Sequence, residues 1–354
     1  MSALDSTVRI AAIGLATPPG PVEQSEALRL LEARYGPELT PSSRSAMRKI
    51  FAHPSVQRRR FAIEQPRDLF GENPDARVGR YTAWAVRLAD EAARGAMREA
   101  GVTPAEVSAL VVNTCTGYIC PGLSTYLLES LGLPRSVRAY DLAGGGCGGA
   151  LANLQAAEAL QRSAPEGVTL SVAVEICSAT FQMGNDLSLI LSNALFSDGA
   201  SAAVLWNRPR GLELTASGSL FAPEYREHIR YVHREGQLHN QLSLQLPGIV
   251  RSSAAKLTAD LLSPRGLTAR DVPHWALHPG GEKILAALGE ELGLTAAQLA
   301  PARAVLAEYG NISSPTVLFV LRRIMEESAS PGAWTVLLAF GAGFSAHAWL
   351  VKMG

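Results

Sequence analysis

Short apolar runs alternate along this chain with longer segments in which apolar residues recur every three to four positions. The short runs predict buried strands at 8–16, 109–115, 137–142, 168–176 and 200–206. The longer segments predict helices at 25–35, 42–51, 80–100 and 187–196. In the alanine-rich segment 80–100, Trp84, Leu88 and Ala92 are placed at helical spacing. The alternation of the two patterns predicts an α/β fold.

The second half of the chain repeats a pattern of the first half. Segment 266–278 follows segment 101–113 at a distance of 165 residues. In both, a glycine precedes a threonine, an acidic residue follows three positions later to form a capping box, and a strand comes next. At nearly the same distance, the glycine-to-helix turn at Cys147 corresponds to the one at Asn311. Such a repeat predicts two half-domains related by a pseudo-twofold axis, in which Cys147 and Asn311 occupy equivalent helix N-termini that face one another.

Cys147 is the candidate nucleophile. A strand-like run ends in the glycines 144–146, Cys147 follows, and a helical segment rich in alanine and leucine comes next. Glycines allow a sharp turn and leave room for a substrate to approach. A cysteine at the start of a helix lies in the field of unpaired N–H groups, and that field favours the nucleophilic thiolate. The alternative is a small buried cysteine at a tight turn.

Composition and charge exclude several classes of protein. The chain has 354 residues, of which 47% are hydrophobic and 18% charged, so it can bury one large core or two joined ones. Its 32 basic and 32 acidic residues cancel, and no bulk field attracts nucleic acid or a membrane surface. The first seven residues do not have the pattern of a signal peptide, and no apolar run reaches the length of about 18 residues expected of a membrane span. We therefore expect a soluble, cytoplasmic protein.

The four cysteines lie in the first half of the chain, at Cys115, Cys120, Cys147 and Cys177. Their spacing matches no pattern of paired zinc ligands, and four are too few for a disulfide scaffold of this size. We expect reduced thiols and no metal site.

His278 ends a predicted strand immediately before the loop 279–281, where a side chain is exposed at a sheet edge. A hydrogen-bonded structural histidine is the plain interpretation of such a position. Beside Cys147 and Asn311 a second role is favoured, because a thiolate needs a neighbouring base and a developing oxyanion needs preorganised donors. The Nε2–H of His278 and the amide of Asn311 are two neutral donors that could converge on one oxygen.

The most basic part of the chain is 44–60, and its predicted helix carries Arg44, Arg48 and Lys49. A solvated helix face is one interpretation of such a run, and a site for a phosphate-bearing ligand is the other.

These motifs resemble those of a known family. Cys147 before a helix, His-Pro-Gly-Gly at 278–281 and Gly-Asn-Ile-Ser-Ser at 310–314 are similar to the catalytic triad of the type III polyketide synthases, the chalcone and stilbene synthase family. The resemblance covers nearly the whole chain. It implies a thiolase-like fold with duplicated halves in a layered αβαβα arrangement, and a homodimer. By this resemblance we place the nucleophile in an N-terminal half, 1–208, and the histidine and asparagine in a C-terminal half, 209–354.

The resemblance also implies a mechanism that uses no cofactor and no metal. Cys147 takes an acyl starter from coenzyme A as a thioester. Malonyl-CoA then loses carbon dioxide while His278 and Asn311 hold the thioester oxygen, and the resulting carbanion attacks the acyl group in a Claisen condensation. Repetition builds a poly-β-ketone that cyclises in the same cavity.

The resemblance assigns further residues to the substrates, and Phe196 matches the family's gatekeeper between the coenzyme A tunnel and the cavity. The expected substrate-binding residues are Cys115, Cys120, Cys177, Thr180, Phe196, Ser313 and Phe340, with Cys120 reaching the cavity of the neighbouring subunit. The expected coenzyme A-binding residues are Arg44, Arg48, Lys49, Gly280 and Gly281.

The chain departs from the family pattern in places that bear on the product. Alanines stand at Ala339 and Ala342 in the C-terminal glycine loop, and Cys115 stands where plant members have threonine. Small apolar cysteines favour an aliphatic acyl-CoA starter and an alkylpyrone or alkylresorcinol-type product. Alternatives are a hydroxynaphthalene synthase that uses only malonyl-CoA, a single-step β-ketoacyl synthase III-like enzyme, and a catalytically silent homologue. A cysteine protease shares the residue types but not their context.

Overall fold

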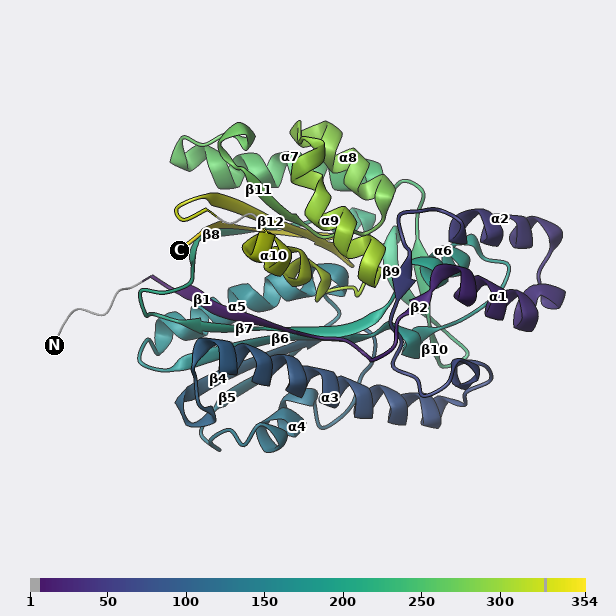
Figure 1. Cartoon of the computed structure of the whole chain (residues 1–354), viewed down its shortest axis with the longest axis horizontal. Coiled ribbons are helices and arrows are strands. Elements are labelled where there is room, and N and C mark those ends of the chain that lie inside the picture. The colour runs from purple at the N-terminus through teal and green to yellow at the C-terminus, as the bar shows by residue number, and fades with distance from the viewer. Residues whose placement is uncertain (1–6, 328–329) are drawn as a thin grey trace.

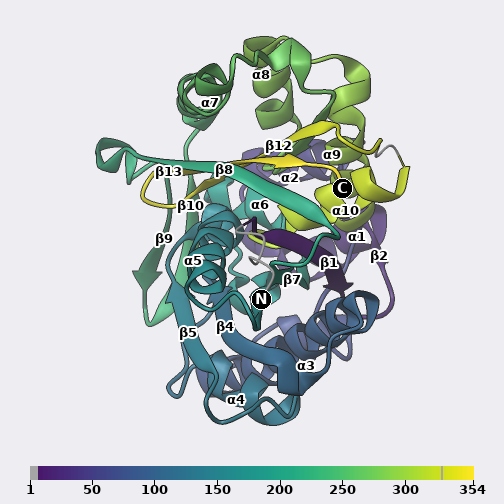
Figure 2. The ribbon, with the colours of Figure 1, turned by 90° about the vertical axis from the view of Figure 1, so that its left-hand side faces the viewer.

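Helices and strands are stacked in five layers in the computed structural model, which describes residues 7–327 and 330–354 (Figure 1). The same layers are visible after a quarter turn (Figure 2). One outer layer contains α7 (Leu246–Leu262) and α8 (Glu282–Leu292), and the other contains α3 (Pro74–Ala100) and α4 (Leu123–Ser130). The middle layer contains α5 (Gly149–Ser163) and α10 (Thr316–Glu327). The predicted αβαβα arrangement is confirmed.

The two strand layers are hydrogen-bonded into one nine-stranded sheet. The first part contains β1 (Arg9–Ala16), β4 (Val107–Thr114), β5 (Arg138–Ala143), β6 (Val168–Ile176) and β7 (Asp198–Trp206). The second part contains β8 (Leu212–Phe221), β11 (His274–Leu277), β12 (Trp334–Gly341) and β13 (Ser345–Lys352). All residues of β6 and β7 are buried, because helices cover both faces of the sheet there.

Both parts of the sheet have the same strand order. In β5–β4–β6–β7–β1, β4 is parallel to β5 and β6, and β7 is antiparallel to β6 and β1. In β11–β12–β13–β8, β11 is parallel to β12, and β13 is antiparallel to β12 and β8. Strands β4, β6, β7 and β1 thus correspond to β11, β12, β13 and β8, and the short pairing of β1 with β8 joins the two parts. This correspondence supports the internal repeat.

The repeated capping boxes are present in both halves. Gly101 and Gly266 both adopt the left-handed conformation, with φ of 70° and 67°. In each half a threonine and an acidic residue then exchange hydrogen bonds, Thr103 with Glu106 and Thr268 with Asp271. The next strand is β4 in the first half and β11 in the second. The local prediction is therefore confirmed.

The predicted elements all occur, with shifted ends. The helix predicted from residue 80 begins at Pro74, because Asn73 caps it by accepting a hydrogen bond from the backbone N–H of Ala76 at 2.8 Å, and proline suits the first turn. The predicted boundary near residue 208 lies between β7 and β8 and stays a prediction. In the second half we predicted the capped turn at 268–271, the strand before His278 and the helix after Asn311, and these correspond to the capping box of Thr268, to β11 and to α10.

A lobe projects beside the layers (Figure 1). Its helices are α1 (Gln24–Tyr35), α2 (Pro41–Phe51) and α6 (Leu187–Leu195). Its short strands are β2 (Val22–Glu23), β3 (Arg58–Arg59), β9 (Ile229–Arg234) and β10 (Gln237–Leu242). A small core that includes Leu31, Met47 and Ile190 holds the three helices together. The remaining helix, α9 (Ala296–Tyr309), packs beside β11 and β3.

Candidate active site

Cys147 lies in a single 3₁₀ turn between β5 and α5, with 9% of its surface exposed. The turn is glycine-rich because another backbone segment passes close to it. A Cβ atom on Gly146 would lie 2.7 Å from the backbone nitrogen of Ala342, and one on Gly148 would lie 3.1 Å from that of Gly341. These distances leave no room for side chains. The loop between β12 and β13 therefore holds the cysteine turn in place.

Ser313, two residues after Asn311, lies close to two thiols. The Ser313 hydroxyl lies 3.3 Å from the sulfur of Cys147 and 3.6 Å from the sulfur of Cys115. Ser313 has a positive φ of 60°, and its backbone N–H donates to Oδ1 of Asn311 at 2.8 Å. The strained backbone at Ser313 is thus tied to the asparagine side chain.

The thiol of Cys147 is not activated by its helix start alone. Burial raises its pKa to about 12, although hydrogen bonds from Ser313 and Asn311 act to lower it. Desolvation therefore outweighs the N-terminal field of the helix in the free site, and the thiol needs the neighbouring base that the sequence also led us to expect. The proton must go to a base when the thiol reacts.

His278 follows β11, and its backbone N–H donates to the carbonyl of Leu338 at 2.8 Å. The side chain is only 2% exposed, and burial lowers its pKa to about 4, so the imidazole is neutral at pH 7. Neither ring nitrogen has a hydrogen-bond partner among residues 7–327 and 330–354. A buried imidazole without partners is costly in a purely structural role, and it is suited to meeting a ligand.

Asn311 is anchored through its backbone. It follows Gly310 (φ 72°), its N–H donates to the carbonyl of Leu195 at 2.8 Å, and its own carbonyl accepts from Ser197 at 2.9 Å. Phe196 thus lies directly beside Asn311 in a parallel bridge. Because Oδ1 of Asn311 accepts from Ser313, the amide NH₂ is the end of the side chain that donates, and it bonds toward Cys147.

Glu175, near the end of β6, is a neighbour of the thiols to which the sequence assigned no role. It is fully buried and accepts hydrogen bonds from the Cys115 N–H at 2.9 Å, the Thr116 hydroxyl at 2.8 Å and the Ser314 hydroxyl at 2.6 Å. Burial raises its pKa. A single carboxylate in the apolar run 168–176 was the signal for it, since a buried charge needs partners.

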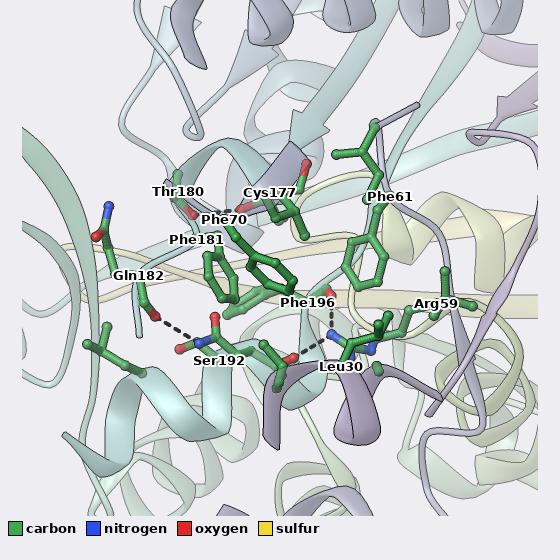
Figure 3. A pocket seen from close by; sticks show the side chains of 18 of the residues that line it. Leu30, Arg59, Phe61, Phe70, Cys177, Thr180, Phe181, Gln182, Ser192 and Phe196 are labelled. Carbon is green, nitrogen blue, oxygen red and sulfur yellow. Dashed lines mark hydrogen bonds between the residues drawn. The ribbon is translucent and has the colours of Figure 1, made fainter. Parts of the chain in front are cut away.

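A pocket with an empty volume of about 760 Å³, part of it open to solvent, lies between the lobe and the layers. Phe61, Phe70, Phe181 and Phe196 gather their rings around it (Figure 3). Three predicted substrate-binding residues line it: Cys177, Thr180 and Phe196. Tyr231 of β9, which no motif marked, lies with its hydroxyl 3.4 Å from that of Thr180.

The other predicted substrate residues lie elsewhere. Cys115 and Ser313 are beside Cys147, as described. Phe340 is buried in β12 and stacks on Phe344 with ring centroids 6.1 Å apart. Cys120 is exposed, and the described chain gives it no contact with the site.

None of the predicted coenzyme A residues lines this cavity. Arg48 and Lys49 are exposed on α2, where Arg48 forms an ion pair with Glu32, and Arg44 is half-buried. Gly280 and Gly281 lie before α8, and a Cβ on Gly281 would lie 3.7 Å from the side chain of Leu195. The glycine loop therefore lies against the residue that precedes Phe196, whereas the cations of α2 stay a prediction.

The described residues contain neither a metal-binding cluster nor a helix that could cross a membrane. No group of three or more histidine, cysteine, aspartate or glutamate side chains among them could hold a metal ion. None of the helices in 7–327 and 330–354 is long and apolar enough to cross a membrane.

Comparison with known proteins identifies the family. Residues 213–353 match the C-terminal domain of chalcone and stilbene synthases, and residues 60–217 match the FAE1/type III polyketide synthase-like proteins. A 1,3,6,8-tetrahydroxynaphthalene synthase of Streptomyces peucetius subsp. caesius is 31% identical, covering 99% of this chain and 94% of that protein. An alpha-pyrone synthesis polyketide synthase-like protein of Mycobacterium tuberculosis is 28% identical, covering 96% and 90%.

The fold agrees. The crystal structure of PKS-I from the brown alga Ectocarpus siliculosus matches with a TM-score of 0.90 at 27% identity, covering 98% of each chain. The chain therefore belongs to the type III polyketide synthases, a family of condensing acyltransferases with a thiolase-like fold.

Proposed function

We propose that this enzyme loads an aliphatic acyl group from coenzyme A onto Cys147, extends it with malonyl-CoA by decarboxylative Claisen condensation, and releases an alkylpyrone or alkylresorcinol-type product. The observation that carries the chemistry is the convergence of Cys147, Ser313 and the Asn311 amide on one buried point. The Cys147 sulfur attacks the acyl carbon while the thiol proton goes to His278; the bond to the coenzyme A sulfur breaks, and His278 returns the proton to the leaving coenzyme A thiolate.

Decarboxylation uses the two neutral donors. As malonyl-CoA loses carbon dioxide, negative charge develops on the thioester oxygen, and N–H donors fixed in a dry site stabilise that charge without reorganisation. The amide of Asn311 is fixed by its bond from Ser313, and the ring nitrogens of His278 have no competing partner in the described chain. The carbanion then attacks the acyl carbon on Cys147, and the sulfur leaves as the new carbon–carbon bond forms.

The cavity supports an apolar starter. Its lining is mainly aromatic and aliphatic, and Cys177 and Thr180 add only small side chains. An apolar pocket discriminates by about 1–3 kcal/mol per methylene, so acceptance should change gradually with chain length. The Thr180 hydroxyl lines the space, with the Tyr231 hydroxyl 3.4 Å from it, and it can orient a growing polyketide without blocking an alkyl chain.

A malonyl-CoA-only hydroxynaphthalene synthase is the second candidate. The relative at 31% identity is described as a tetrahydroxynaphthalene synthase, whereas the one at 28% is described as acting in alpha-pyrone synthesis. Mass spectrometry of products from malonyl-CoA with and without a series of saturated acyl-CoAs separates the two. Alkylated products that lengthen with the starter support our proposal, and a naphthalene product that ignores added acyl-CoA overturns it.

We also propose a homodimer. Strand β5 lies at the edge of the nine-stranded sheet, and Tyr140 on it is 48% exposed. An exposed sheet edge is a surface on which a second copy can pair. Sedimentation analysis checks the association, and a monomer at all concentrations would contradict it.

A further inference from the structure

Arg59 is a buried cation that forms no ion pair within residues 7–327 and 330–354. Its surface is only 2% exposed, and the buried carboxylate of Asp198 attracts it from beyond ion-pair distance. Burial lowers the pKa of its guanidinium to about 9, so the group is still charged at neutral pH. A buried charge of this kind is more expensive than an apolar side chain of the same volume. The presence of this buried charge in the wall of the cavity therefore needs an explanation.

The guanidinium instead holds the end of α6. It donates to the backbone carbonyls of Asn193 and Phe196, the latter at 3.1 Å (Figure 3). A helix leaves its last carbonyls without partners and carries partial negative charge there, so a cation is favoured at that end. The faces of Phe51 and Phe61 cover the charge at 5.6 and 4.8 Å.

Gln24 completes the clamp. Its side-chain oxygen accepts from Nε of Arg59 at 2.9 Å, and its amide NH₂ donates to the carbonyl of Ala194 at 2.8 Å. Arg59 and Gln24 thus hold the backbone carbonyls of Asn193, Ala194 and Phe196 at the end of α6. The planar guanidinium can make these bonds in fixed directions, which lysine cannot do.

The clamped segment carries two parts of the proposed site. Phe196 faces the cavity, and the residues on either side of it bond to the backbone of Asn311. The stem of Arg59 also touches this turn directly, since a Cβ on Gly310 would lie 2.8 Å from its Cγ and 2.8 Å from the Leu195 carbonyl. Movement of Arg59 would therefore shift Asn311 as well as Phe196.

We propose that Arg59 is a positioning residue of the condensation site: by holding the end of α6 it aligns the Asn311 amide and the Phe196 ring for decarboxylation of malonyl-CoA. The inference rests on the proposed function, in which Asn311 donates to the thioester oxygen. Arg59 touches no reacting atom. The role accounts for a charge that the core would otherwise exclude.

The test compares two half-reactions in Arg59→Met and Arg59→Lys. Malonyl-CoA alone is converted to acetyl-CoA and carbon dioxide, which needs the Asn311 amide, whereas acylation of Cys147 by an acyl-CoA in a single turnover does not. We expect Arg59→Met to lower kcat for decarboxylation by about 10- to 100-fold, since a misplacement of about 1 Å costs about 100-fold. The KM for malonyl-CoA and the rate of acylation should stay close to wild type. Arg59→Lys keeps the charge and should give a smaller loss in the same half-reaction, so it serves if the methionine variant does not fold.

Arg94→Met is the matched control. Arg94 bonds to Asp90 and to a backbone carbonyl on the outer helices, away from the site. Its removal can lower the melting temperature but should leave the ratio of decarboxylation to acylation unchanged. Equal losses in both half-reactions for Arg59→Met and Arg59→Lys, in step with melting temperature, would show a merely structural role and overturn the inference.

A double variant separates this inference from the proposed function. Arg59→Met added to Asn311→Ala should cause little further loss of decarboxylation, because Arg59 acts through Asn311. If Asn311→Ala itself decarboxylates at the wild-type rate, the proposed function fails. If Asn311→Ala is impaired but Arg59→Met is not, only the role of Arg59 fails.

Discussion

Asn113 and His278 occupy corresponding positions in the two halves, yet their side chains are in opposite states. Asn113, at the end of β4, donates to the Ser314 hydroxyl at 2.9 Å and accepts from the Asn153 amide at 3.0 Å. His278, immediately after β11, has no partner on either ring nitrogen within the described chain. One position of the repeat thus ties the halves together, and its counterpart is left free for a ligand. Unsatisfied buried polar groups are rare in native proteins, so this difference sets His278 apart as the member of the pair suited to meeting a ligand.

The turns that precede α5 and α10 also differ from each other, in the residues that build them. The turn before α5 is built from glycines that let another backbone approach, and it presents a sulfur atom. The turn before α10 is built from Asn311 and serines that bond to one another and to the Phe196 segment. A duplicated scaffold therefore brings the Cys147 thiol and the Asn311 amide to one place from two directions.

The largest expected effect is the loss of the sulfur. Cys147→Ala should abolish product formation, because removal of a catalytic nucleophile costs on the order of 10⁶ in kcat. The thermal unfolding curve should change little, since a small side chain is replaced by another. Product analysis and intact-mass labelling with iodoacetamide check this. Product from the variant, or full activity of wild-type enzyme in which Cys147 carries the label, would remove Cys147 from the role.

Loss of either proposed oxyanion donor, His278 or Asn311, should have the next largest effect. His278→Ala and Asn311→Ala should each lower malonyl-CoA decarboxylation by about 100- to 1000-fold, as found when one oxyanion donor is removed. The double variant should lose less than the product of the two factors, because both donors serve one oxygen. Release of acetyl-CoA from malonyl-CoA measures the step. Fully multiplicative losses would argue for separate tasks.

His278 should also control the reactivity of the thiol. Transfer of the proton from Cys147 to His278 leaves the net charge of the site unchanged, and the two ions attract each other. In His278→Ala the thiol must ionise alone, and its pKa is raised to about 12 by burial, so less thiolate is present at every pH below that value. Alkylation at pH 7 should then be slower by about 10²-fold or more and rise about tenfold per pH unit up to pH 9. Identical pH profiles of alkylation in variant and wild type would exclude His278 as the base.

Much of this site was predictable from local sequence, and the rest was not. The glycine turn at Cys147, the loop after His278 and the turn at Asn311 are continuous segments, so a repeat and a resemblance could indicate them. Glu175, Arg59 and Tyr231 depend on which segments meet in space. Arg59 lies in a basic run that suggested a solvated face or a phosphate site, but it is buried under the site because α6 ends above it. The raised pKa of Cys147 could not be predicted for the same reason, since burial depends on packing and not on neighbours in sequence.

The smallest expected effect on catalysis comes from Asn113, the hydrogen-bonded member of the Asn113–His278 pair. Asn113→Ala removes two buried hydrogen bonds, one to the Ser314 hydroxyl and one from the Asn153 amide, and at about 0.5–1.5 kcal/mol each they contribute about 1–3 kcal/mol together. The free energy of unfolding should therefore fall by about that amount, while decarboxylation per folded enzyme changes by less than about tenfold. His278→Ala should show the reverse, with stability kept and decarboxylation lost. Denaturant unfolding and the acetyl-CoA assay on the same two preparations decide the matter. If Asn113→Ala lost decarboxylation as strongly as His278→Ala without losing stability, the two positions would share a catalytic task, and the contrast between the halves would be wrong.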